Sequence, residues 1–528
     1  MLQLNKVTQR LSLALFAVLT ISLITSLFFK HDWLWLDEVL SYLLISDPSI
    51  AHMNDAVVSG MDANPPLFPN LYWLIGHAIS LNPLFLRAIS VVLFATAITL
   101  FYRYTTALLG NPITNFILIT VIIVFTYLNL TLSTQIRAYA LFLLLGFGFF
   151  TVLHRLIADP SRLTWLISCC VLGFLFAFTH NFGLFYLTAT GSFFALLLLW
   201  SKQRQYVWVL AAHALIGVVW LASWYTDFEI QTQAGKPHSW IPLPTVMSFF
   251  STIGEIAPTL SSKLERNPRL LFLPALRFVA LIALFIYLAA PRLKAGFTSI
   301  RQDKAFTFYL LSGWIYFVTI GISLVVSFAH TSVFLSRYFW PSHLLVIYQL
   351  VYAWYALTKR WPVRLRWPSS NLVVRLLPVY VLLFGVLLFY QNRKISVFTG
   401  EILPYLPKLD KRYPIFFESA NYFLPIWFLD KNANVRYLLD WDTAIRKGNK
   451  LNASVEHKIL DAVREHYHVP GIVQPQQFNR TEVSHFYVID ETERYQIEDF
   501  IQKGRVRVIR QLPIGLPGHQ ILECELEP

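Results

Sequence analysis

The chain has 528 residues, of which 56% are hydrophobic and only 14% are charged. Globular domains average about 45–50% apolar and about 25% charged residues. These values therefore exclude a soluble globular enzyme, a disordered chain and a disulfide-rich scaffold, and the three cysteines provide no disulfide framework. The net charge of +13 fits the Lys and Arg excess in inner loops of membrane proteins, so we predict no nucleic-acid partner.

Uncharged apolar runs occur through most of the chain, and a bilayer requires about 20 such residues per helix. They predict a polytopic α-helical membrane protein with eleven spans, at approximately 11–29, 83–102, 113–131, 138–153, 163–179, 182–200, 206–224, 270–290, 305–328, 338–358 and 372–390. The first run has no small-residue cleavage site, which favours an uncleaved helix over a signal peptide.

The connections between the predicted spans alternate in charge. One set contains mostly Lys and Arg, whereas the other contains mostly Asp and Glu. Because inner loops carry the basic excess, we predict a cytoplasmic N-terminus. An odd number of spans then places the C-terminal segment outside.

Two domains are predicted. Residues 1–391 form a transmembrane domain with external loops at about 30–82 and 225–269, and residues 392–528 form a soluble domain outside the membrane. Alternating apolar residues at 435–439, 485–489 and 506–509 predict strands, and 456–466 predicts a helix. The second domain is therefore expected to be a small α/β domain.

The loop after the first span contains two adjacent carboxylates, Asp37 and Glu38, next to Trp33 and Trp35. Tryptophan side chains prefer the interface between lipid and water. A carboxylate there can act as a general base for a hydroxyl nucleophile. Two carboxylates can also hold a divalent cation against a phosphate. Taken alone, the pair is better explained as solvated acidic residues of an outer loop.

The same loop continues with Asp62-Ala63-Asn64-Pro65-Pro66-Leu67. In this combination it resembles the first external loop of the GT-C membrane glycosyltransferases, in the branch that contains protein O-mannosyltransferases, aminoarabinose transferases and bacterial relatives. That branch has an Asp-Glu pair after the first helix and an acidic residue before a His-Pro-Pro-Leu segment. Asn64 occupies the place of the His here.

Three further motifs are similar to the same family, and all lie at predicted outer ends of spans. They are Arg137-Ala138-Tyr139 at the fourth span, Thr179-His180-Asn181-Phe182-Gly183 between the fifth and sixth, and Ser336-Arg337-Tyr338 at the tenth. The resemblance covers about residues 30–345 as scattered motifs. The predicted domain at residues 392–528, which we call the tail domain or tail, offers none.

The resemblance implies a multi-pass enzyme of a bacterial inner or plasma membrane. Its donor would be a sugar on polyprenyl phosphate, transferred with inversion to an acceptor hydroxyl at the outer face. Asp37 is the implied base and Glu38 its helper, and a Mg²⁺ or Mn²⁺ ion held by this pair stays open. The acceptor also stays open among a lipid, a polysaccharide and a protein.

The remaining candidate residues would contact the substrates. Arg137, Arg337 and Tyr338 are expected to bind the donor phosphate, since a guanidinium binds phosphate in a bidentate manner. The alternative for both arginines is a snorkelling anchor at a helix end. Asp62, His180 and Tyr139 are candidates for substrate binding. The alternative for Asp62 is a turn residue before the Pro-Pro pair, and the alternative for His180 is a packed interfacial side chain.

A transporter or flippase of lipid-linked saccharides is the main alternative function. Such a protein would need ionisable residues within its spans and often contains repeated halves. Here the charges lie at span ends and in loops, and no internal repeat is found. A non-catalytic membrane scaffold and a ligase with a diphosphate-linked donor also remain as alternatives.

Overall fold

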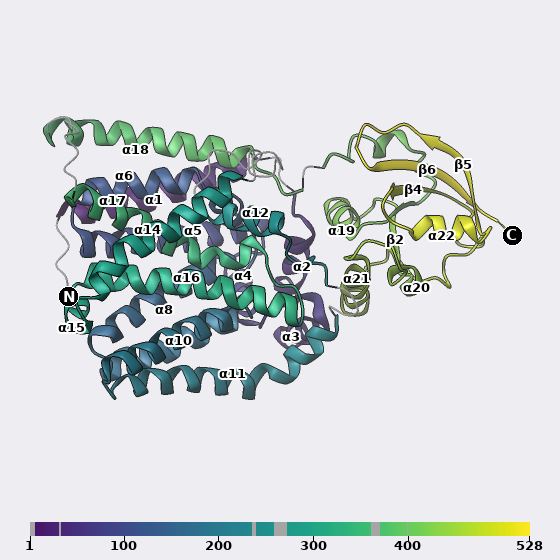
Figure 1. Ribbon diagram of the computed structural model, residues 1–528. Coiled ribbons are helices and arrows are strands. Elements are labelled where there is room, and N and C mark those ends of the chain that lie inside the picture. Colours follow the sequence, from purple (N-terminus) through teal and green to yellow (C-terminus); the bar gives the residue numbers. More distant parts are fainter. Residues whose placement is uncertain are drawn as a thin grey trace. The chain divides into compact units, whose positions relative to one another are not determined.

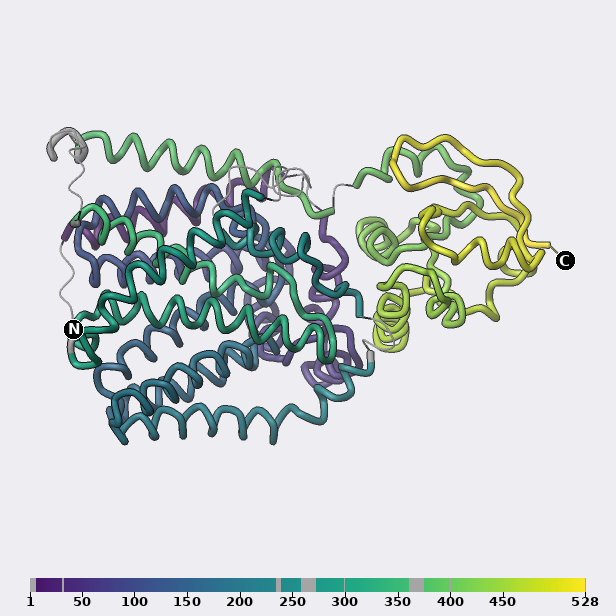
Figure 2. The backbone as a smooth tube through the Cα atoms, in the orientation of Figure 1, coloured from purple at the N-terminus to yellow at the C-terminus, as the bar shows by residue number. Residues whose placement is uncertain are grey.

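The computed structural model describes residues 6–30, 33–234, 239–257, 272–360, 370–398 and 400–527. Two compact units are present. The first, called the helical unit, comprises Met1–Lys30, Asn82–Trp224 and Leu243–Ile395, and the second, called the mixed unit, comprises His31–Leu81, Tyr225–Pro242 and Ser396–Pro528. Each unit therefore combines segments that are far apart in the sequence. Figure 2, coloured by residue number, lets the reader trace these segments along the backbone.

Eight of the described helices are long and apolar enough to cross a membrane over all or most of their length. They are α1 (Lys6–Phe28), α5 (Pro83–Leu109), α8 (Tyr139–Ala158), α10 (Gly183–Ser201), α11 (Tyr206–Ala234), α14 (Phe272–Leu293), α16 (Lys304–Ala329) and α18 (Ser370–Arg393). Figure 1 shows most of them as long helices of one bundle. The chain is a multi-pass membrane protein, as predicted.

The three other predicted spans are also helices. The span predicted at 113–131 is divided into α6 (Pro112–Val124) and α7 (Tyr127–Leu132), because Thr126 between them adopts an extended conformation. The other two are α9 (Leu163–Thr179), which is shorter than a full span, and α17 (Trp340–Arg360).

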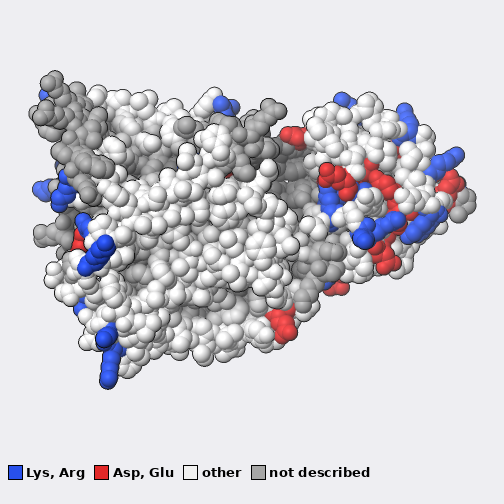
Figure 3. Space-filling model, in the orientation of Figure 1, with Lys and Arg blue, Asp and Glu red and all other residues white. Residues whose placement is uncertain are grey.

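The helical unit is closely packed, and some of its buried polar groups are hydrogen-bonded to residues far away in the sequence. Helix α8 packs on α5 and α9, whereas α16 packs on α10 and α17. The buried Asn129 side chain accepts a hydrogen bond from the indole of Trp340 at 2.8 Å and donates one to Nε2 of His343 at 2.9 Å. A bilayer offers no water to such groups, so partners within the protein are required. The face of this unit seen in Figure 3 is almost uncharged, with Lys and Arg near one end.

The mixed unit contains a six-stranded sheet with the order β3-β2-β1-β4-β6-β5. Strands β3 (Ile472–Val473), β2 (Val435–Leu438), β1 (Ile415–Phe417) and β4 (His485–Glu491) are parallel. Strand β6 (His519–Leu526) pairs antiparallel with both of its neighbours, β4 and β5 (Val506–Leu512). Helices α19 (Ala420–Leu429), α21 (Ala453–Tyr467) and α22 (Gln496–Gln502) accompany it. The predicted α/β architecture of the tail is confirmed.

The first loop is a helical part of the mixed unit. It consists of α2 (Leu36–Ile45), α3 (Ile50–Ala56), the π-helical turn η1 (Val57–Met61) and α4 (Leu67–Ala78). Helix α2 packs on α19, and both α3 and η1 pack on α21.

Asp47, between α2 and α3, fixes this packing. Its carboxylate accepts hydrogen bonds from the Tyr467 hydroxyl at 2.9 Å and the Ser49 N–H at 2.8 Å, and it contacts the His52 ring at 2.5 Å. The indole of Trp73 donates to the Asp47 carbonyl at 2.7 Å. The segment that carries Asp37 and Glu38 is thereby held on the tail domain.

Candidate functional site

Five predicted site residues lie together in the helical unit, and we call them the arginine cluster: Arg137, Tyr139, His180, Arg337 and Tyr338. The His180 ring centroid is 4.7 Å from that of Tyr338 and 6.0 Å from that of Tyr139. The Arg337 guanidinium carbon lies 5.8 Å from the Tyr139 ring centroid and 5.9 Å from that of Tyr338. Residues from three separate segments thus meet at one place.

Neighbouring side chains hold the irregular segments of the cluster in position. Before Arg137, the carbonyl of Gln135 accepts a hydrogen bond from the Ser90 hydroxyl at 2.6 Å. Next to Arg337, in the 3-10 helix η3 (Ser336–Phe339), the Ser336 hydroxyl donates to the Glu255 carboxylate at 2.5 Å. Both arginines are therefore anchored through adjacent residues, so their side chains start from fixed backbone positions.

His180 is a neutral member of the cluster. It lies between α9 and α10, is only 4% exposed, and accepts a hydrogen bond at Nδ1 from the backbone N–H of Phe182. Burial, together with the charges of Arg137 and Arg337, lowers the pKa of His180 to about 3. The proton of the neutral ring therefore lies on Nε2. No residue in the described parts of the chain accepts a hydrogen bond from that nitrogen.

Asp37 and Glu38 lie in the first turn of α2, where the helix dipole favours negative charge. Glu38 is 1% exposed and Asp37 is partly buried. Consecutive helical residues point about 100° apart, so the two carboxylates do not face one another as a clamp. Within the described residues, neither belongs to a group of three metal-ligating side chains. A cation at this pair would use one carboxylate together with oxygens of a substrate phosphate.

Asp62 lies in a turn that side chains of neighbouring residues stabilise. Its Oδ1 atom accepts hydrogen bonds from the backbone N–H and the side-chain amide of Asn64, at 3.1 and 2.9 Å. Gln231, near the end of α11, donates from Nε2 to the carbonyls of Val57, Asp62 and Asn64 at 3.0, 2.9 and 3.3 Å. Asn64 thus orients the Asp62 carboxylate, at the position where the resembling family has His.

Sequence reasoning missed Gln231. It belongs to no motif, and the only signal was an uncharged polar residue just beyond the predicted end of a span. In the structure it is buried and bonds to three carbonyls of the first loop. The predicted site residues therefore form two sets, the arginine cluster in the helical unit and Asp37, Glu38 and Asp62 in the mixed unit.

Comparison with known proteins shows the fold. Neither a protein-family model nor a curated protein sequence matches the chain. The crystal structure of ArnT from Cupriavidus metallidurans bound to undecaprenyl phosphate matches with a TM-score of 0.52 and 10% identity, over 96% of this chain and 97% of that one. A zinc and sulfate complex of the Archaeoglobus fulgidus oligosaccharyltransferase matches with a TM-score of 0.37 and 11% identity, over 89% and 68%. The likeness to ArnT confirms the predicted GT-C fold.

Proposed function

We propose that the chain is an integral-membrane glycosyltransferase that moves a sugar from a polyprenyl-phosphate donor to an acceptor hydroxyl. The observation that carries the proposal is the arginine cluster, in which two guanidinium groups lie around a neutral histidine. This arrangement has the charge and hydrogen-bond donors that a phosphate requires. Its fold is that of a protein whose crystal structure contains undecaprenyl phosphate.

The arginine cluster would bind the phosphate that leaves the sugar. As the bond between the sugar and the phosphate oxygen breaks, negative charge develops on that oxygen. Arg137 and Arg337 would stabilise this charge, and the Nε2–H of His180 would supply an uncharged donor beside them. Removing one preorganised donor of this kind typically costs about 3–4 kcal/mol in the transition state. Tyr139 and Tyr338 would pack against the guanidinium of Arg337.

Asp37 would act as the general base. The acceptor hydroxyl gives its proton to the Asp37 carboxylate, its oxygen forms the new bond to the anomeric carbon, and polyprenyl phosphate leaves with the electron pair of the old bond. Attack from the side opposite the phosphate inverts the anomeric configuration. Glu38 would support Asp37, and Asp62, held by Asn64, would contact the acceptor or the donor. A Mg²⁺ or Mn²⁺ ion at the pair would neutralise phosphate charge.

The proposed reaction takes place at the outer face of a bacterial inner or plasma membrane. The distribution of Lys and Arg among the loops supports this orientation, with the N-terminus in the cytoplasm and the tail domain outside. The first loop and the tail then lie on the same side. The acceptor is a lipid, a polysaccharide or a protein that carries a free hydroxyl there.

The test is a turnover assay on the purified full chain in nanodiscs. A panel of polyprenyl-phosphate sugars is offered with pooled acceptors, and release of polyprenyl phosphate is measured with and without chelator. We expect Asp37→Asn to lower the rate by about 10²–10⁴-fold, the usual contribution of a positioned base. Asp55→Asn, an exposed residue of α3 in the same loop, is the matched control.

Two results would contradict the proposal at different levels. Full turnover in Asp37→Asn would remove the base role but leave the transferase class standing. Absence of both release and binding for every donor would remove the class itself and favour the transport alternative.

A further inference from the structure

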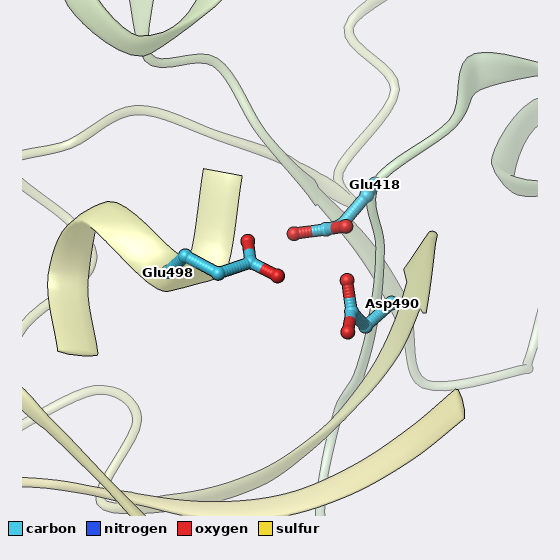
Figure 4. Close-up of side chains that lie close together, drawn as sticks. All are labelled: Glu418, Asp490 and Glu498. Atoms are coloured by element: carbon cyan, nitrogen blue, oxygen red, sulfur yellow. The ribbon is translucent and has the colours of Figure 1, made fainter. Parts of the chain in front are cut away.

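Three acidic side chains of the tail domain converge in a place that the proposed reaction does not use. We call Glu418, Asp490 and Glu498 the carboxylate triad. One oxygen from each lies within 4.8 Å of the others, and Figure 4 shows the three carboxylates pointing toward one another. Within the described residues, this is the only group of three or more such ligands. Glu418 and Asp490 are buried, whereas Glu498 is partly exposed.

The triad lies where a sheet of this topology is suited to bind ligands. Glu418 directly follows β1, and Asp490 is near the carboxyl end of β4, its parallel neighbour. From β1 the chain continues to β2 and β3 on one side, while β4 lies on the other side. The sheet order therefore reverses between β1 and β4, and such a switch point is the usual ligand position in open α/β sheets. Glu498 comes from α22, which follows β4 in the chain.

Backbone groups fix the first member of the triad. The two carboxylate oxygens of Glu418 accept hydrogen bonds from the N–H groups of Glu491 at 3.0 Å and Ile497 at 2.8 Å. Each carboxylate oxygen can accept a second interaction. Glu418 is therefore preorganised and still able to coordinate an ion.

The second member, Asp490, has a buried carboxylate oxygen that no group of the described residues satisfies. Asp490 is 0% exposed, and its Oδ2 atom accepts a hydrogen bond from Gln520. Its Oδ1 atom has no hydrogen-bond partner among the described residues. The Asp490 carboxylate lies beside those of Glu418 and Glu498 in Figure 4. A buried carboxylate oxygen without a partner destabilises the folded chain unless a proton or a cation occupies the place.

The basic side chains that flank Glu498 in the sequence are engaged with other carboxylates. Arg494 pairs with Glu456 and Glu491, both at 2.9 Å, and Lys503 pairs with Asp499 at 2.5 Å. No ion pair among the described residues includes a carboxylate of the triad. The place between the three carboxylates therefore lacks a positively charged side chain from the described parts of the chain.

We propose that Glu418, Asp490 and Glu498 form a binding site for a hard divalent cation of the Mg²⁺, Mn²⁺ and Ca²⁺ class. The ligand set contains only oxygen, which suits these ions rather than zinc or copper. Opposite ligands of Mg²⁺ are about 4.2 Å apart and those of Ca²⁺ about 5 Å, so a triad within 4.8 Å encloses an ion of this size. Water completes the coordination. The ion links β1, β4 and α22 at the switch point.

Mn²⁺ is the probe, used on the purified full chain in detergent. Bound Mn²⁺ per chain is measured by electron paramagnetic resonance in wild type, Asp490→Asn and Glu498→Gln. We expect both variants to lose one tightly bound Mn²⁺ per chain. Glu493→Gln, which changes an exposed carboxylate five residues before Glu498, keeps it. Asp37→Asn also keeps it, so this site and the proposed active site are tested separately.

Thermal unfolding separates a cation site from a group that only shares protons. Asp490→Asn removes a negative charge from a buried acidic group, and asparagine has nearly the same shape as aspartate. Without metal, the variant should therefore have a Tm equal to or higher than that of metal-free wild type. Added Mn²⁺ should raise the Tm of wild type in a concentration-dependent manner and leave the variant unchanged. Three results would each overturn the proposal. The first is equal Mn²⁺ binding in wild type and both triad variants, and the second is loss of Mn²⁺ only in Asp37→Asn. The third is a wild-type Tm that does not change when Mn²⁺ is added.

Discussion

The backbone N–H of Phe182 donates a hydrogen bond to Nδ1 of His180 at 3.1 Å, and this contact determines which ring nitrogen carries the proton. His180→Gln keeps a side-chain N–H close to the Nε2 position, whereas His180→Asn keeps only a group close to Nδ1. We expect His180→Asn to lower kcat/KM for the lipid-linked donor by about 10²-fold, as for loss of one preorganised donor. His180→Gln should lose less. Equal activity of the two variants would show that the Nε2 proton has no part in transfer.

The lowered pKa of His180 also predicts how stability depends on pH. Burial and the two arginines hold this pKa at about 3, so the folded chain stays unprotonated there while the unfolded chain takes up a proton below about 6.5. The unfolded state then binds more protons, and stability falls as pH is lowered from about 6.5 toward 3. His180→Gln removes this effect. The Tm of the variant relative to wild type should therefore be higher at pH 5 than at pH 8.

Arg137 and Arg337 can be tested as phosphate ligands by paired substitutions. Alanine at either position should reduce kcat/KM by about 10²–10³-fold, equivalent to about 3–4 kcal/mol. Lysine should restore only part of the loss, because it keeps the charge but not the bidentate geometry. Arg162→Ala, an exposed residue at the start of α9, is the control. Unchanged donor kinetics in both alanine variants would support the snorkelling alternative.

Gln231 should hold the Asp62 turn in place. Gln231→Leu removes the donor shared by three buried carbonyls, and leaving such groups unsatisfied costs about 1–3 kcal/mol each. We expect faster amide hydrogen exchange across residues 57–64 and reduced turnover, with the rest of the chain unchanged. Gln233→Leu, on an exposed side chain two residues later, is the comparison. Identical exchange in the two variants would show that Gln231 does not stabilise the turn.

Much of the helical architecture follows from hydropathy, which is a property of single segments. Each of the eleven predicted spans is mostly helical within the described residues. The break after α6 did not follow, since no Pro or Gly marks Thr126. The hydrogen bond between Asn129 and His343 joins residues 214 positions apart in the sequence. A local sequence pattern cannot predict a contact between residues so far apart. Tertiary contacts of this kind decide where a span is interrupted.

The candidate site was predictable where its residues lie in short motifs at span ends. Arg137, His180 and Arg337 each belong to such a motif, and the structure brings all three together. The carboxylate triad has no motif, because Glu418 comes from one strand end and Asp490 from another much later in the chain. Only the pairing of β1 with β4 makes them neighbours.

The hydrogen bond between Asp47 and Tyr467 spans 420 residues of sequence, and it has a consequence for biosynthesis. At about 5–20 residues per second, a ribosome that has made Asp47 needs about 20–80 s to reach Tyr467. During that interval α2 and α3 lack the surfaces of α19 and α21 on which they pack. A chain released before its tail would insert apolar helices yet leave Asp37 and Glu38 on an unsupported loop. Synthesis through Tyr467 therefore sets the earliest moment at which the proposed transferase can become active.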